Sequence, residues 1–499
     1  MSVSPQAFHF HLKNLADTEK YLIAYSGGVD SHVLLHLCSQ LKNSPSGFEK
    51  SFSAVYIDHG LSYNASKWGK HCQQVCFELD IPLTIIEVDA KPKKGQSPEA
   101  SARIARYQAF AELLDKNECL LTAQHLDDQA ETLLLQLLRG SGNKGLSAMP
   151  RVKTFAEGFL CRPMLDYKKQ DILAYAQLHH LQWIEDESNQ EEHYDRNYLR
   201  HTILPQLESR WPAAQENFAK TAELLAESQI LLDEVAQADI QPLMVRNQQG
   251  KQEKDKLLLA PIVKLLECET LPDSNSYLCQ HRELARVKNL LRFWIHANQL
   301  PLPSKKILEQ IIHNVIQTKP DAMPLVSWRR DAFRCEIRKY RDKLYLIDVS
   351  SAAYHSKNLS DEAEQVLKLC HYALTEDQVL TISETNSEIT LLAAKELSAA
   401  RGLERQSLLS QPLSVRFRNG GERFRRTADG QSRLLKHWFQ EQGIPPWERS
   451  QLPLIYWGDE LIQVGNSIVN NALLSDDANN SIIIHWISKD LDEIKRNKR

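Results

Sequence analysis

The chain has 499 residues, a length that suggests about three domains. Hydrophobic residues make up 42% and charged residues 25%, which is ordinary for a soluble globular protein. The formal net charge of −4 gives no global basic signal, so a nucleic-acid-binding surface would require a local concentration of positive charge.

The sequence disfavours secretion and membrane insertion. It lacks the pattern of a secretory signal at its start, and no apolar run reaches the ~20 residues that span a bilayer. Nine scattered cysteines argue against a disulfide framework, and the absence of a Cys-x-x-Cys pair argues against a structural zinc. We expect a cytoplasmic protein without a membrane partner, in which Cys72 and Cys76 are packed thiols.

Short apolar runs alternate with helical patterns over residues 1–210, which predicts an α/β domain with a parallel sheet. Because ligands bind at the carboxyl ends of parallel strands, the polar and glycine-rich residues after each strand are candidate site residues. We expect strands at 21–25, 53–57, 83–88 and 119–123, and helices at 31–41, 65–79, 99–114 and 127–138.

From about residue 211, strands are expected to give way to helices as far as about residue 317. Within this region, residues 247–255 are typical of an exposed linker. Residues 331–347 are strand-like, and residues 350–364 resemble a domain boundary. The remainder combines short strands and turns with one clear helix near residues 434–442.

The most specific local motif is Ser-Gly-Gly-Val-Asp-Ser at residues 26–31, between a predicted strand and a predicted helix. Glycines permit a tight turn, and a helix N-terminus attracts anions. Asp30 would repel a phosphate but suits a Mg²⁺ ion that bridges phosphates. A strand-to-helix turn capped by Ser31 is the alternative. We predict that phosphate groups bind at Ser26, Gly27, Gly28, Val29, Asp30 and Ser31.

The loop lacks the lysine of a Walker A sequence, which disfavours an ordinary P-loop kinase or GTPase. It resembles the loop of the PP-loop ATP pyrophosphatases, which cleave ATP between the α- and β-phosphates to adenylate a carbonyl-type oxygen. NAD synthetase, GMP synthetase and several tRNA-modifying enzymes share that loop.

Two further motifs supply candidate ligands. Asp58 and His59 follow the second strand, where they can hold adenine and ribose, although a polar turn would look similar. Adjacent carboxylates follow the fourth strand and are costly unless a cation compensates them. We therefore predict Asp128 as a second Mg²⁺ ligand and Asp127 as a helix cap, with Glu131 completing a capping network.

Arginines recur at helical spacing in two places. Arg103 and Arg106 share a face with Tyr107 and can contact phosphate, or can form a solvated ion-paired surface. Arg196 and Arg200 share another face, and a pyrophosphate leaving group needs such cations. The glycine-rich basic loop 139–149 is either a mobile connection or a substrate-gripping segment.

Positive charge is concentrated near the C-terminus, where it interleaves with aromatic residues. Cations neutralise phosphates and aromatic rings can stack on bases, which favours RNA over a β-surface that covers a core of aromatics. The cations in question are Arg416, Arg418, Arg423, Arg425, Arg426 and Lys436, and the aromatics are Phe417, Phe424, Trp438 and Phe439.

In this order, the motifs resemble those of the tRNA(Ile)-lysidine synthetase family across most of residues 20–215. The carrying motifs are Asp58-His-Gly-Leu, Glu99-x-x-x-Arg103, His125-Leu-Asp-Asp-Gln-x-Glu-Thr, Arg139-Gly-Ser-Gly and Asp186-x-Ser-Asn with Arg196-Asn. One departure is Gln124, where members often carry a second histidine. Residues 279–304 and 415–449 are similar to the middle and last domains of the longer members.

The resemblance implies an N-terminal doubly wound parallel sheet of the adenine nucleotide alpha hydrolase type, then a helical domain and a small α+β domain. The expected boundaries are 1–215 for the ATP-binding catalytic domain, 216–350 for a mainly helical tRNA-recognition domain and 365–490 for a C-terminal tRNA-binding domain. Dimers are known in the family, so a homodimer is among the expected partners.

The resemblance also implies a two-step ligation. The C2 oxygen of the wobble cytidine in the CAU anticodon of tRNA(Ile) attacks the α-phosphate of ATP, and pyrophosphate leaves. The ε-amine of free L-lysine then displaces AMP to give lysidine, which changes the amino-acid specificity of the tRNA from methionine to isoleucine. Catalysis is assigned to Asp30, Asp128, Arg106 and Arg196, with Mg²⁺ held by Asp30 and Asp128.

Two alternatives remain at this point. A PP-loop tRNA thiolase usually needs paired cysteines, and Cys38, Cys119 and Cys161 offer no obvious pair. A non-catalytic tRNA-binding protein would not need the intact loop and Asp128.

Overall fold

The computed structural model of the chain separates into two compact units, Met1–Leu232 and Asp233–Arg499. Among the residues that it describes, no helix is both long and apolar enough to cross a membrane. The described residues are 3–15, 18–44, 48–60, 65–89, 98–185, 194–246, 252–266, 276–319, 322–330, 332–350, 365–367, 378–382, 387–393, 402–408, 411, 413–427, 430–466, 468–477 and 480–488.

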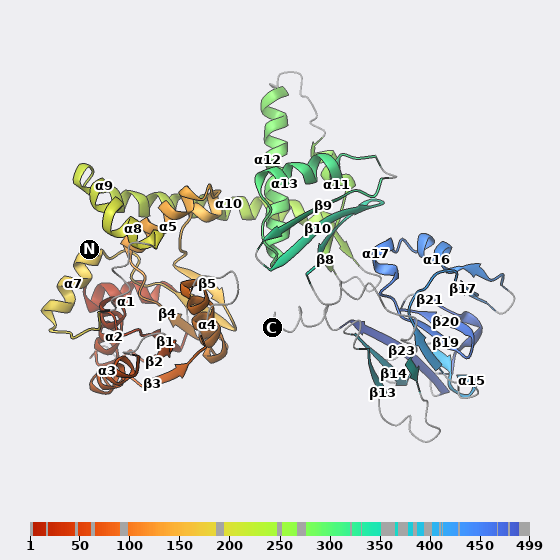
Figure 1. Cartoon of the computed structure of the whole chain (residues 1–499), viewed down its shortest axis with the longest axis horizontal. Helices are drawn as coiled ribbons and strands as arrows, with labels where there is room; N and C mark the ends of the chain where they lie inside the picture. The colour runs from red at the N-terminus through yellow and green to blue at the C-terminus, as the bar shows by residue number, and fades with distance from the viewer. Residues whose placement is uncertain are drawn as a thin grey trace. The chain divides into compact units, whose positions relative to one another are not determined.

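The first unit is built on a six-stranded sheet of order β3-β2-β1-β4-β6-β5 (Figure 1). All neighbouring strands are parallel except β5, which runs antiparallel to β6. The strands are β1 Lys20–Ala24, β2 Ser51–Asp58, β3 Leu83–Glu87, β4 Cys119–Leu121, β5 Val152–Phe155 and β6 Gly158–Cys161.

The four strands and four helices expected in residues 21–138 are all present, with ends within two residues of the predicted ones. The helices of this unit are α1 Pro5–Lys13, α2 Val29–Lys42, α3 Ala65–Glu78, α4 Pro98–Leu113, α5 Leu126–Leu138, α6 Asn143–Leu146, α7 Lys169–Leu178, α8 Asp195–Tyr198, α9 Leu204–Arg210 and α10 Ala214–Ile240, which continues into the second unit. A π-helical segment, Leu199–Ile203, joins α8 to α9.

Alternate residues of the strands pack on opposite faces of this sheet, as the period of a strand requires. Tyr21 and Ile23 of β1 belong to the core that includes Leu34 of α2. Leu22, between them, belongs to the opposite core with Phe110 of α4. The sheet is therefore covered on both faces, which is the doubly wound arrangement expected from the sequence.

The strand order reverses direction at β1 and β4, which lie side by side in the middle of the sheet. In open α/β sheets, such a switch point leaves a crevice outside the carboxyl ends of the two strands, where ligands bind. The chain leaves β1 into the 26–31 loop and α2, and it leaves β4 into His125 and α5. The fold thus brings the two most specific motifs of the sequence to one edge.

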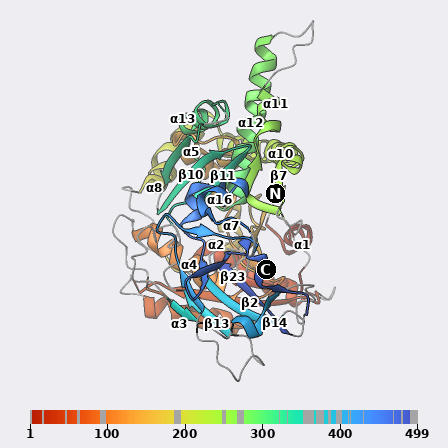
Figure 2. The same cartoon turned by 90° about the vertical axis from the view of Figure 1, so that its right-hand side faces the viewer.

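The second unit begins with a five-stranded antiparallel sheet of order β7-β8-β11-β10-β9 (Figure 2). Its core includes Trp294 of α12 and Leu308 of α13. The elements are β7 Met244–Arg246, β8 Gln252–Leu258, β9 Leu325–Arg330, β10 Phe333–Tyr340, β11 Lys343–Asp348, α11 Ala260–Leu266, α12 Ser276–Ala297 and α13 Lys305–Ile311, with a 3₁₀ turn at Gln241–Leu243 and a π-helical segment at Ile312–Ile316.

Two expectations for this region were wrong. Strands do not stop at residue 211, and residues 252–255 are not a linker, because they lie in β8 and precede the residues that pair with β11. The run Gln-Glu-Lys-Asp has low β-propensity, so pairing and the buried Leu257 make the strand where local preference does not. The expected strand-like stretch at 331–347 corresponds to β10 and β11. The boundary at 350–364 falls almost entirely outside the described residues.

The last part of the chain contains two five-stranded sheets, of order β12-β16-β19-β20-β21 and β13-β14-β23-β15-β22, and a two-stranded ribbon, β17-β18. The helix expected near 434–442 is α16. The elements are β12 Gln365–Leu367, β13 Gln378–Ile382, β14 Ser387–Ala393, β15 Gly402–Glu404, β16 Leu413–Arg416, β17 Arg423–Phe424, β18 Arg433–Leu434, β19 Leu454–Trp457, β20 Glu460–Val464, β21 Ile468–Val469, β22 Leu474–Ser475, β23 Ser481–Ser488, α15 Arg405–Leu408, α16 Leu435–Glu441 and α17 Pro446–Arg449, with a 3₁₀ turn at Asn471–Leu473.

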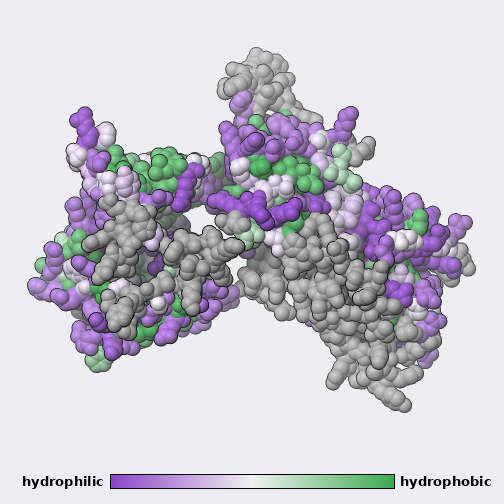
Figure 3. Space-filling model, in the orientation of Figure 1, coloured by the Kyte–Doolittle hydropathy of each residue, from purple (hydrophilic) through white to green (hydrophobic). Residues whose placement is uncertain are grey.

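Exposed apolar side chains of unit 1 occur on α5 and on α10. Leu138 is 76% exposed and Leu224 is 54% exposed, and green areas lie over the same elements in Figure 3.

The division of the chain into three domains remains a prediction.

Candidate active site

The 26–31 loop has the geometry of an anion-binding turn. Gly27 has φ +81°, a backbone conformation that favours glycine, and a Cβ atom there would come within 2.5 Å of Ile184 Cδ1 and force that side chain to shift. Gly28 caps α2 without a side-chain hydrogen bond, so the first-turn N–H groups from Val29 onward lack intrahelical partners. Bare amides and the helix dipole therefore lie at the carboxyl end of β1, beside the switch point of the sheet.

The two serine hydroxyls of the loop bond to each other. Ser26 Oγ and Ser31 Oγ are 3.1 Å apart, and Ser31 Oγ donates to the Gly28 carbonyl at 2.9 Å. The Ser26 amide also donates to Ser31 Oγ, at 3.2 Å. Ser31 is buried and fixes the shape of the loop in the ligand-free chain, which is a role that the motif alone did not reveal.

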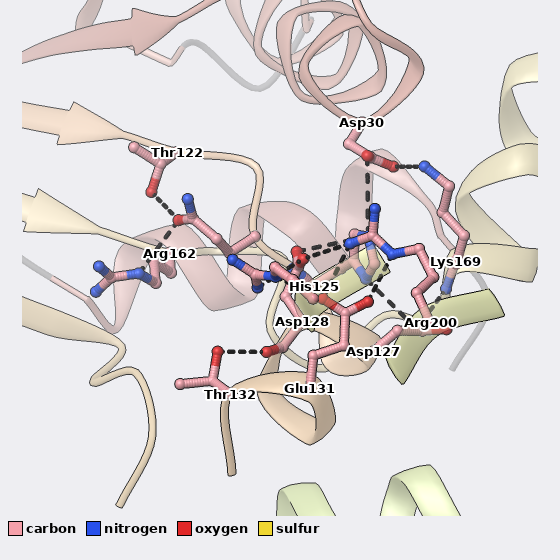
Figure 4. Close-up of polar contacts among 12 residues, drawn as sticks. Asp30, Thr122, His125, Asp127, Asp128, Glu131, Thr132, Arg162, Lys169 and Arg200 are labelled. Carbon is pink, nitrogen blue, oxygen red and sulfur yellow. Dashed lines mark hydrogen bonds and ion pairs between the residues drawn. The ribbon is translucent and has the colours of Figure 1, made fainter. Parts of the chain in front are cut away.

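Carboxylates from both halves of the crevice meet around one histidine (Figure 4). His125 Nε2 lies 3.8 Å from Asp30 Oδ2 and 3.5 Å from Asp128 Oδ2, and its Nδ1 lies 3.4 Å from Asp127 Oδ2. Asp128 also accepts the His125 backbone N–H at 3.0 Å, which closes a capping box at the start of α5. The predicted metal ligands Asp30 and Asp128 are thus brought together. We call Asp30, Asp127, Asp128 and Glu131 the carboxylate cluster.

The protonation of the cluster reflects its burial and its partners. Burial alone would lower the pKa of His125, but Asp128, Asp127 and Asp30 together outweigh it, so that pKa is raised. Burial alone would raise the pKa of Asp128, but His125, Arg196 and Arg200 together lower it. The carboxylate of Asp128 is therefore held in its charged form.

Two arginines bind the carboxylate cluster from the helix that starts at α8. Glu131 is only 1% exposed and accepts from Arg196 Nε and from Arg200 Nε, both at 2.6 Å. Asp128 Oδ1 lies 3.2 Å from Arg196 Nη2 and 3.3 Å from Arg200 Nη2. The shared face expected for these arginines is present, and Arg200 lies in the π-helical segment, a feature that is frequent at functional sites.

Lys169 is a site residue that sequence analysis missed. Its ammonium lies 2.5 Å from Asp30 Oδ1, and its backbone N–H donates to Asp127 Oδ2 at 2.9 Å. A signal was present in the sequence, because Lys168 and Lys169 stand at the start of α7, where the helix dipole disfavours cations.

The residues expected to hold adenine and ribose lie at the end of β2. Asp58 Oδ1 accepts the Gly60 N–H at 2.9 Å and so stabilises the turn. His59 Nδ1 is buried without a hydrogen-bond partner among the described residues. Burial and the nearby charge of Arg106 lower the pKa of His59, which places Arg106 close to this turn. Asp186 and Asn189 lie outside the described residues.

On the other side of His125, a buried arginine follows β6. Arg162 is 4% exposed, and its Nε donates to Gln124 Oε1 at 3.2 Å, while Thr122 Oγ1 donates to the same oxygen at 2.5 Å. Gln124, the departure from the family pattern, therefore positions Arg162, and Figure 4 shows Thr122 and Arg162 on either side of their shared partner. The loop 139–149 is fastened by Gln129, whose side chain bonds both N–H and carbonyl of Met149.

The chemistry of the carboxylate cluster fits a Mg²⁺ ion that arrives with ATP. Mg²⁺ is commonly bound by one or two carboxylates together with substrate phosphates and water. Asp30 and Asp128 supply two carboxylates beside the anion-binding amides of the loop. Within the described ranges, no group of three or more His, Cys, Asp or Glu side chains is arranged to hold a metal by itself, so phosphate oxygens would have to complete such a site.

Two cysteines lie together although the sequence offered no obvious pair. Cys119 and Cys161 form a pair, because they lie on the neighbouring strands β4 and β6 with their sulfur atoms in contact. Both are fully buried in the hydrophobic core of the first unit, out of contact with solvent, which does not suit sulfur transfer to a substrate. Cys72 and Cys76 are buried thiols, as expected.

The basic segment near the C-terminus divides into exposed and internal residues. Arg423, Arg425, Arg426 and Lys436 are exposed, whereas Arg418 is half-buried and lies 3.5 Å from Glu422. The Arg416 guanidinium lies over the Tyr456 ring at 4.5 Å. Phe424, Trp438 and Phe439 are buried core residues, so the suggestion that they stack on bases was wrong. Trp438 and Phe439 lie in the short helix α16 and Phe424 in a two-residue strand, and such short elements do not show from sequence which side faces the core.

Comparison with known proteins agrees with this architecture. Residues 4–207 match the model of a PP-loop domain, residues 281–345 that of the TilS substrate binding domain and residues 413–486 that of the TilS substrate C-terminal domain.

Three relatives extend over nearly the whole chain, and each carries the name tRNA(Ile)-lysidine synthase. The one from Coxiella burnetii is 37% identical over 92% of this chain and 92% of its own length. The one from Methylococcus capsulatus is 36% identical over 93% of this chain and 96% of its own length. The one from Escherichia coli O157:H7 is 35% identical over 95% of this chain and 98% of its own length. With such identity over nearly full length, and with the PP-loop and its carboxylates at the switch point, the chain belongs to the tRNA(Ile)-lysidine synthase family.

Proposed function

We propose that this chain is an ATP-dependent ligase that joins free L-lysine to C2 of the wobble cytidine in the CAU anticodon of tRNA(Ile). The reaction proceeds through an adenylated cytidine and releases pyrophosphate and then AMP. The observation that carries the proposal is the meeting of Asp30 and Asp128 around His125, directly beside the open amides of the 26–31 loop.

In the first step, the 26–31 loop binds the β- and γ-phosphates and leaves the α-phosphate open to the C2 oxygen of the base. The amides from Gly27 to Ser31 stabilise the charge that develops on pyrophosphate, as oriented N–H donors do at a departing anion. A Mg²⁺ ion held by Asp30 and Asp128 would neutralise charge on the phosphates. Arg196 and Arg200 are held by Glu131. Their guanidinium groups would neutralise negative charge on the pyrophosphate as it leaves.

Lys169 supplies the cation that the loop itself lacks. In the ligand-free chain its ammonium is paired with Asp30, and the side chain is 33% exposed, so it is free to turn toward a phosphate. A lysine is a flexible point charge and a common phosphate ligand. On this proposal, the Lys169 ammonium leaves the Asp30 carboxylate and binds a phosphate of ATP instead.

In the second step, the ε-amine of lysine attacks C2 of the adenylated base and displaces AMP. The amine must lose a proton to become a nucleophile, and the carboxylates of the cluster, which lie together at this sheet edge, can accept it. The target base lies in the anticodon loop, where it can be unstacked, which suits a buried reaction centre. We further propose that tRNA phosphates bind the exposed Arg423, Arg425, Arg426 and Lys436, with Arg416 and Arg418 supporting that surface.

A single assay tests the proposal. The full chain is incubated with a tRNA(Ile) transcript that carries a CAU anticodon, ATP and lysine, and pyrophosphate and the modified nucleoside are measured. Asp30→Asn should abolish pyrophosphate release and leave tRNA binding intact. The matched control is Asp115→Asn, an exposed position in the turn before β4. Equal turnover of Asp30→Asn and the control would contradict the role given to Asp30.

The homodimer expected from the resemblance stays a proposal. The molar mass of the protein in solution, measured by light scattering across the concentration range of the assay, tests this proposal. A mass of two chains would support the dimer, and a mass of one chain would contradict it.

A further inference from the structure

The main chain that follows α7 runs against the 26–31 loop. Helix α7 ends at Leu178, and His180 adopts the left-handed conformation with φ +53°. The Leu181 N–H then donates to the Ala176 carbonyl at 2.9 Å, which is the bond that closes a Schellman motif. The end of α7 therefore sets the direction in which the chain leaves the helix. We call the residues that follow, 181–185, the 181–185 segment.

The 181–185 segment belongs to no helix or strand and is held by its tertiary contacts. Leu181, Trp183 and Ile184 pack, partly buried, against the core beside α2. The Ile184 N–H donates to the Gly27 carbonyl at 3.0 Å. The Ile184 side chain also lies against Gly27, where a Cβ atom would come 2.5 Å from Ile184 Cδ1. Both the main chain and the side chain of Ile184 thus contact the loop.

The hydrogen bond from Ile184 fixes the peptide unit between Gly27 and Gly28. In a trans peptide, the C=O and the N–H that follows it point in opposite directions. Because the Gly27 carbonyl points toward the 181–185 segment, the Gly28 N–H points away from it. Among the residues that the structure describes, this N–H has no recorded partner, and it stands directly before the first turn of α2.

A peptide unit between two glycines needs such a contact more than any other. Glycine adopts positive and negative φ about equally, so the plane of this peptide can rotate at little steric cost. Rotation by half a turn would exchange the two groups, and the Gly27 carbonyl oxygen would then stand where the Gly28 N–H stood. An oxygen with partial negative charge repels a phosphate. The loop therefore binds an anion well in one orientation of this peptide and poorly in the other.

The next peptide unit is fixed from within α2 itself. The Gly28 carbonyl accepts the His32 N–H and Ser31 Oγ, both at 2.9 Å. The buried His32 ring, in turn, forms a hydrogen bond with the main chain of Gln182, which joins α2 to the 181–185 segment. The orientation of the Gly28 carbonyl is thus determined locally, whereas that of the Gly27 carbonyl depends on a residue far away in the sequence.

We propose that the 181–185 segment positions the phosphate-binding amide of Gly28, with Ile184 as the positioning residue. This inference rests on the proposed function, because it takes the 26–31 loop as the binding site of the ATP phosphates. Ile184 acts through Gly27 and not through contact with a substrate. It holds the empty loop in the orientation that a phosphate requires, so that ATP does not have to turn the peptide when it binds.

The test removes the Ile184 N–H and keeps the side chain. Translation of the full chain with the α-hydroxy acid analogue of isoleucine at position 184 places an ester oxygen where the N–H stands. The matched control is the corresponding ester at Trp183, whose N–H has no hydrogen bond recorded within the described ranges. Ile184→Val is a second control, because it retains the N–H and most of the packing against Gly27.

Turnover is measured with ATP, lysine and the tRNA(Ile) transcript, and inhibition by pyrophosphate and by adenosine is measured in the same reaction. For the ester at 184, we expect the KM for ATP and the inhibition constant of pyrophosphate to rise by about 5-fold or more, as the loss of a hydrogen bond to a buried residue implies. A smaller population of the competent loop weakens binding but not turnover at saturation, so kcat should stay within about 2-fold. Inhibition by adenosine, which has no phosphate, should not change, and both controls should resemble the wild type.

Several results would overturn the inference. An unchanged KM for ATP, an equal rise for both esters, or a fall in kcat alone would show that the Ile184 bond does not prepare the loop for phosphate. Equal weakening of pyrophosphate and adenosine would indicate a general loosening of the first unit and would equally overturn it. A wild type that releases pyrophosphate would keep the proposed function intact in all these cases. If pyrophosphate does not compete with ATP in the wild type, the phosphate role of the loop, and the proposed function with it, fails first.

Discussion

Replacing Glu131 with glutamine removes the negative charge that holds two arginines and changes little else in size. The carboxylate is 1% exposed and accepts three hydrogen bonds, at 2.6 Å from Arg196 Nε, 2.6 Å from Arg200 Nε and 3.0 Å from Arg200 Nη2. A glutamine keeps one acceptor and turns an N–H donor toward guanidinium donors. The arginines would keep Asp128 as their charged partner.

The magnitude follows from the burial of the partners. Breaking a buried ion pair from one side costs about 3 to 5 kcal/mol. The two arginine side chains remain 31% and 37% exposed, so solvent compensates part of that loss. We expect a loss of about 2 to 3 kcal/mol, which lowers the midpoint of thermal unfolding of a unit of this size by about 4 to 12 °C.

The assay must report on the first unit alone, because the chain contains two compact units. Hydrogen exchange of peptides from β1 and α2, followed by mass spectrometry at rising temperature, meets that need. Glu223→Gln is the matched control, since Glu223 is 58% exposed and pairs with Arg151 on the surface, where the expected loss is about 0 to 1 kcal/mol. If Glu131→Gln shifts the midpoint no more than Glu223→Gln, the buried carboxylate does not organise the arginines.

Three further predictions follow from other parts of the chain. Lys169→Met should weaken the binding of a fluorescent ATP analogue by about 10-fold, and Lys169→Arg should restore part of it; equal affinity of all three proteins would remove Lys169 from the phosphate site. Burial and His179 lower the pKa of His36 to about 4, so the native state resists protonation and stability falls as pH drops from about 6.5 toward 4. His36→Gln should therefore reduce the stability lost between pH 7 and pH 5 by about 2 kcal/mol in urea unfolding, and an unchanged pH profile would be the contrary result. Arg423, Arg425 and Arg426 should be replaced together by glutamine. We expect tRNA binding to weaken and the slope of log K against log salt to fall in magnitude by up to about 3, with turnover at saturating tRNA preserved. An unaltered slope would show that the segment is structural.

Sequence patterns predicted the catalytic unit well because its signals are local and repeated. Apolar runs of strand length alternate with amphipathic helices, and the glycines and acids stand where strands end. The meeting of Asp30 and Asp128 could be inferred because both follow strands of one parallel sheet, although only the strand order shows that β1 and β4 are neighbours. The prediction was poorer for β8, in which a charged run forms a strand because pairing of the strand with β7 and β11 outweighs local preference.

Side-chain partners at long range were the main omission. Nothing near Lys169 in the sequence indicates Asp30, which is 139 positions away, and nothing near Arg162 indicates Gln124. Spacing also could not distinguish the arginines that face solvent from the aromatic residues between them that fill the core. Such facts depend on how distant elements pack, and local propensity carries little information about that.

The exposure of the charged groups at the sheet edge explains how one site can be stable when empty and still accept ATP. Its four carboxylates face three permanent cations, and the raised pKa of His125 responds to the excess of negative charge. ATP brings more negative charge to this place, so we expect the cations to turn from carboxylates toward phosphates, and a Mg²⁺ ion bound by Asp30 and Asp128 would replace them as the counter-charge. The partner that stays fixed, Glu131, is 1% exposed, whereas Lys169, Arg196 and Arg200 are 33%, 31% and 37% exposed. A buried anchor with cations that reach solvent is the arrangement that such an exchange requires, because only groups still in contact with water can change partners without crossing a desolvated state.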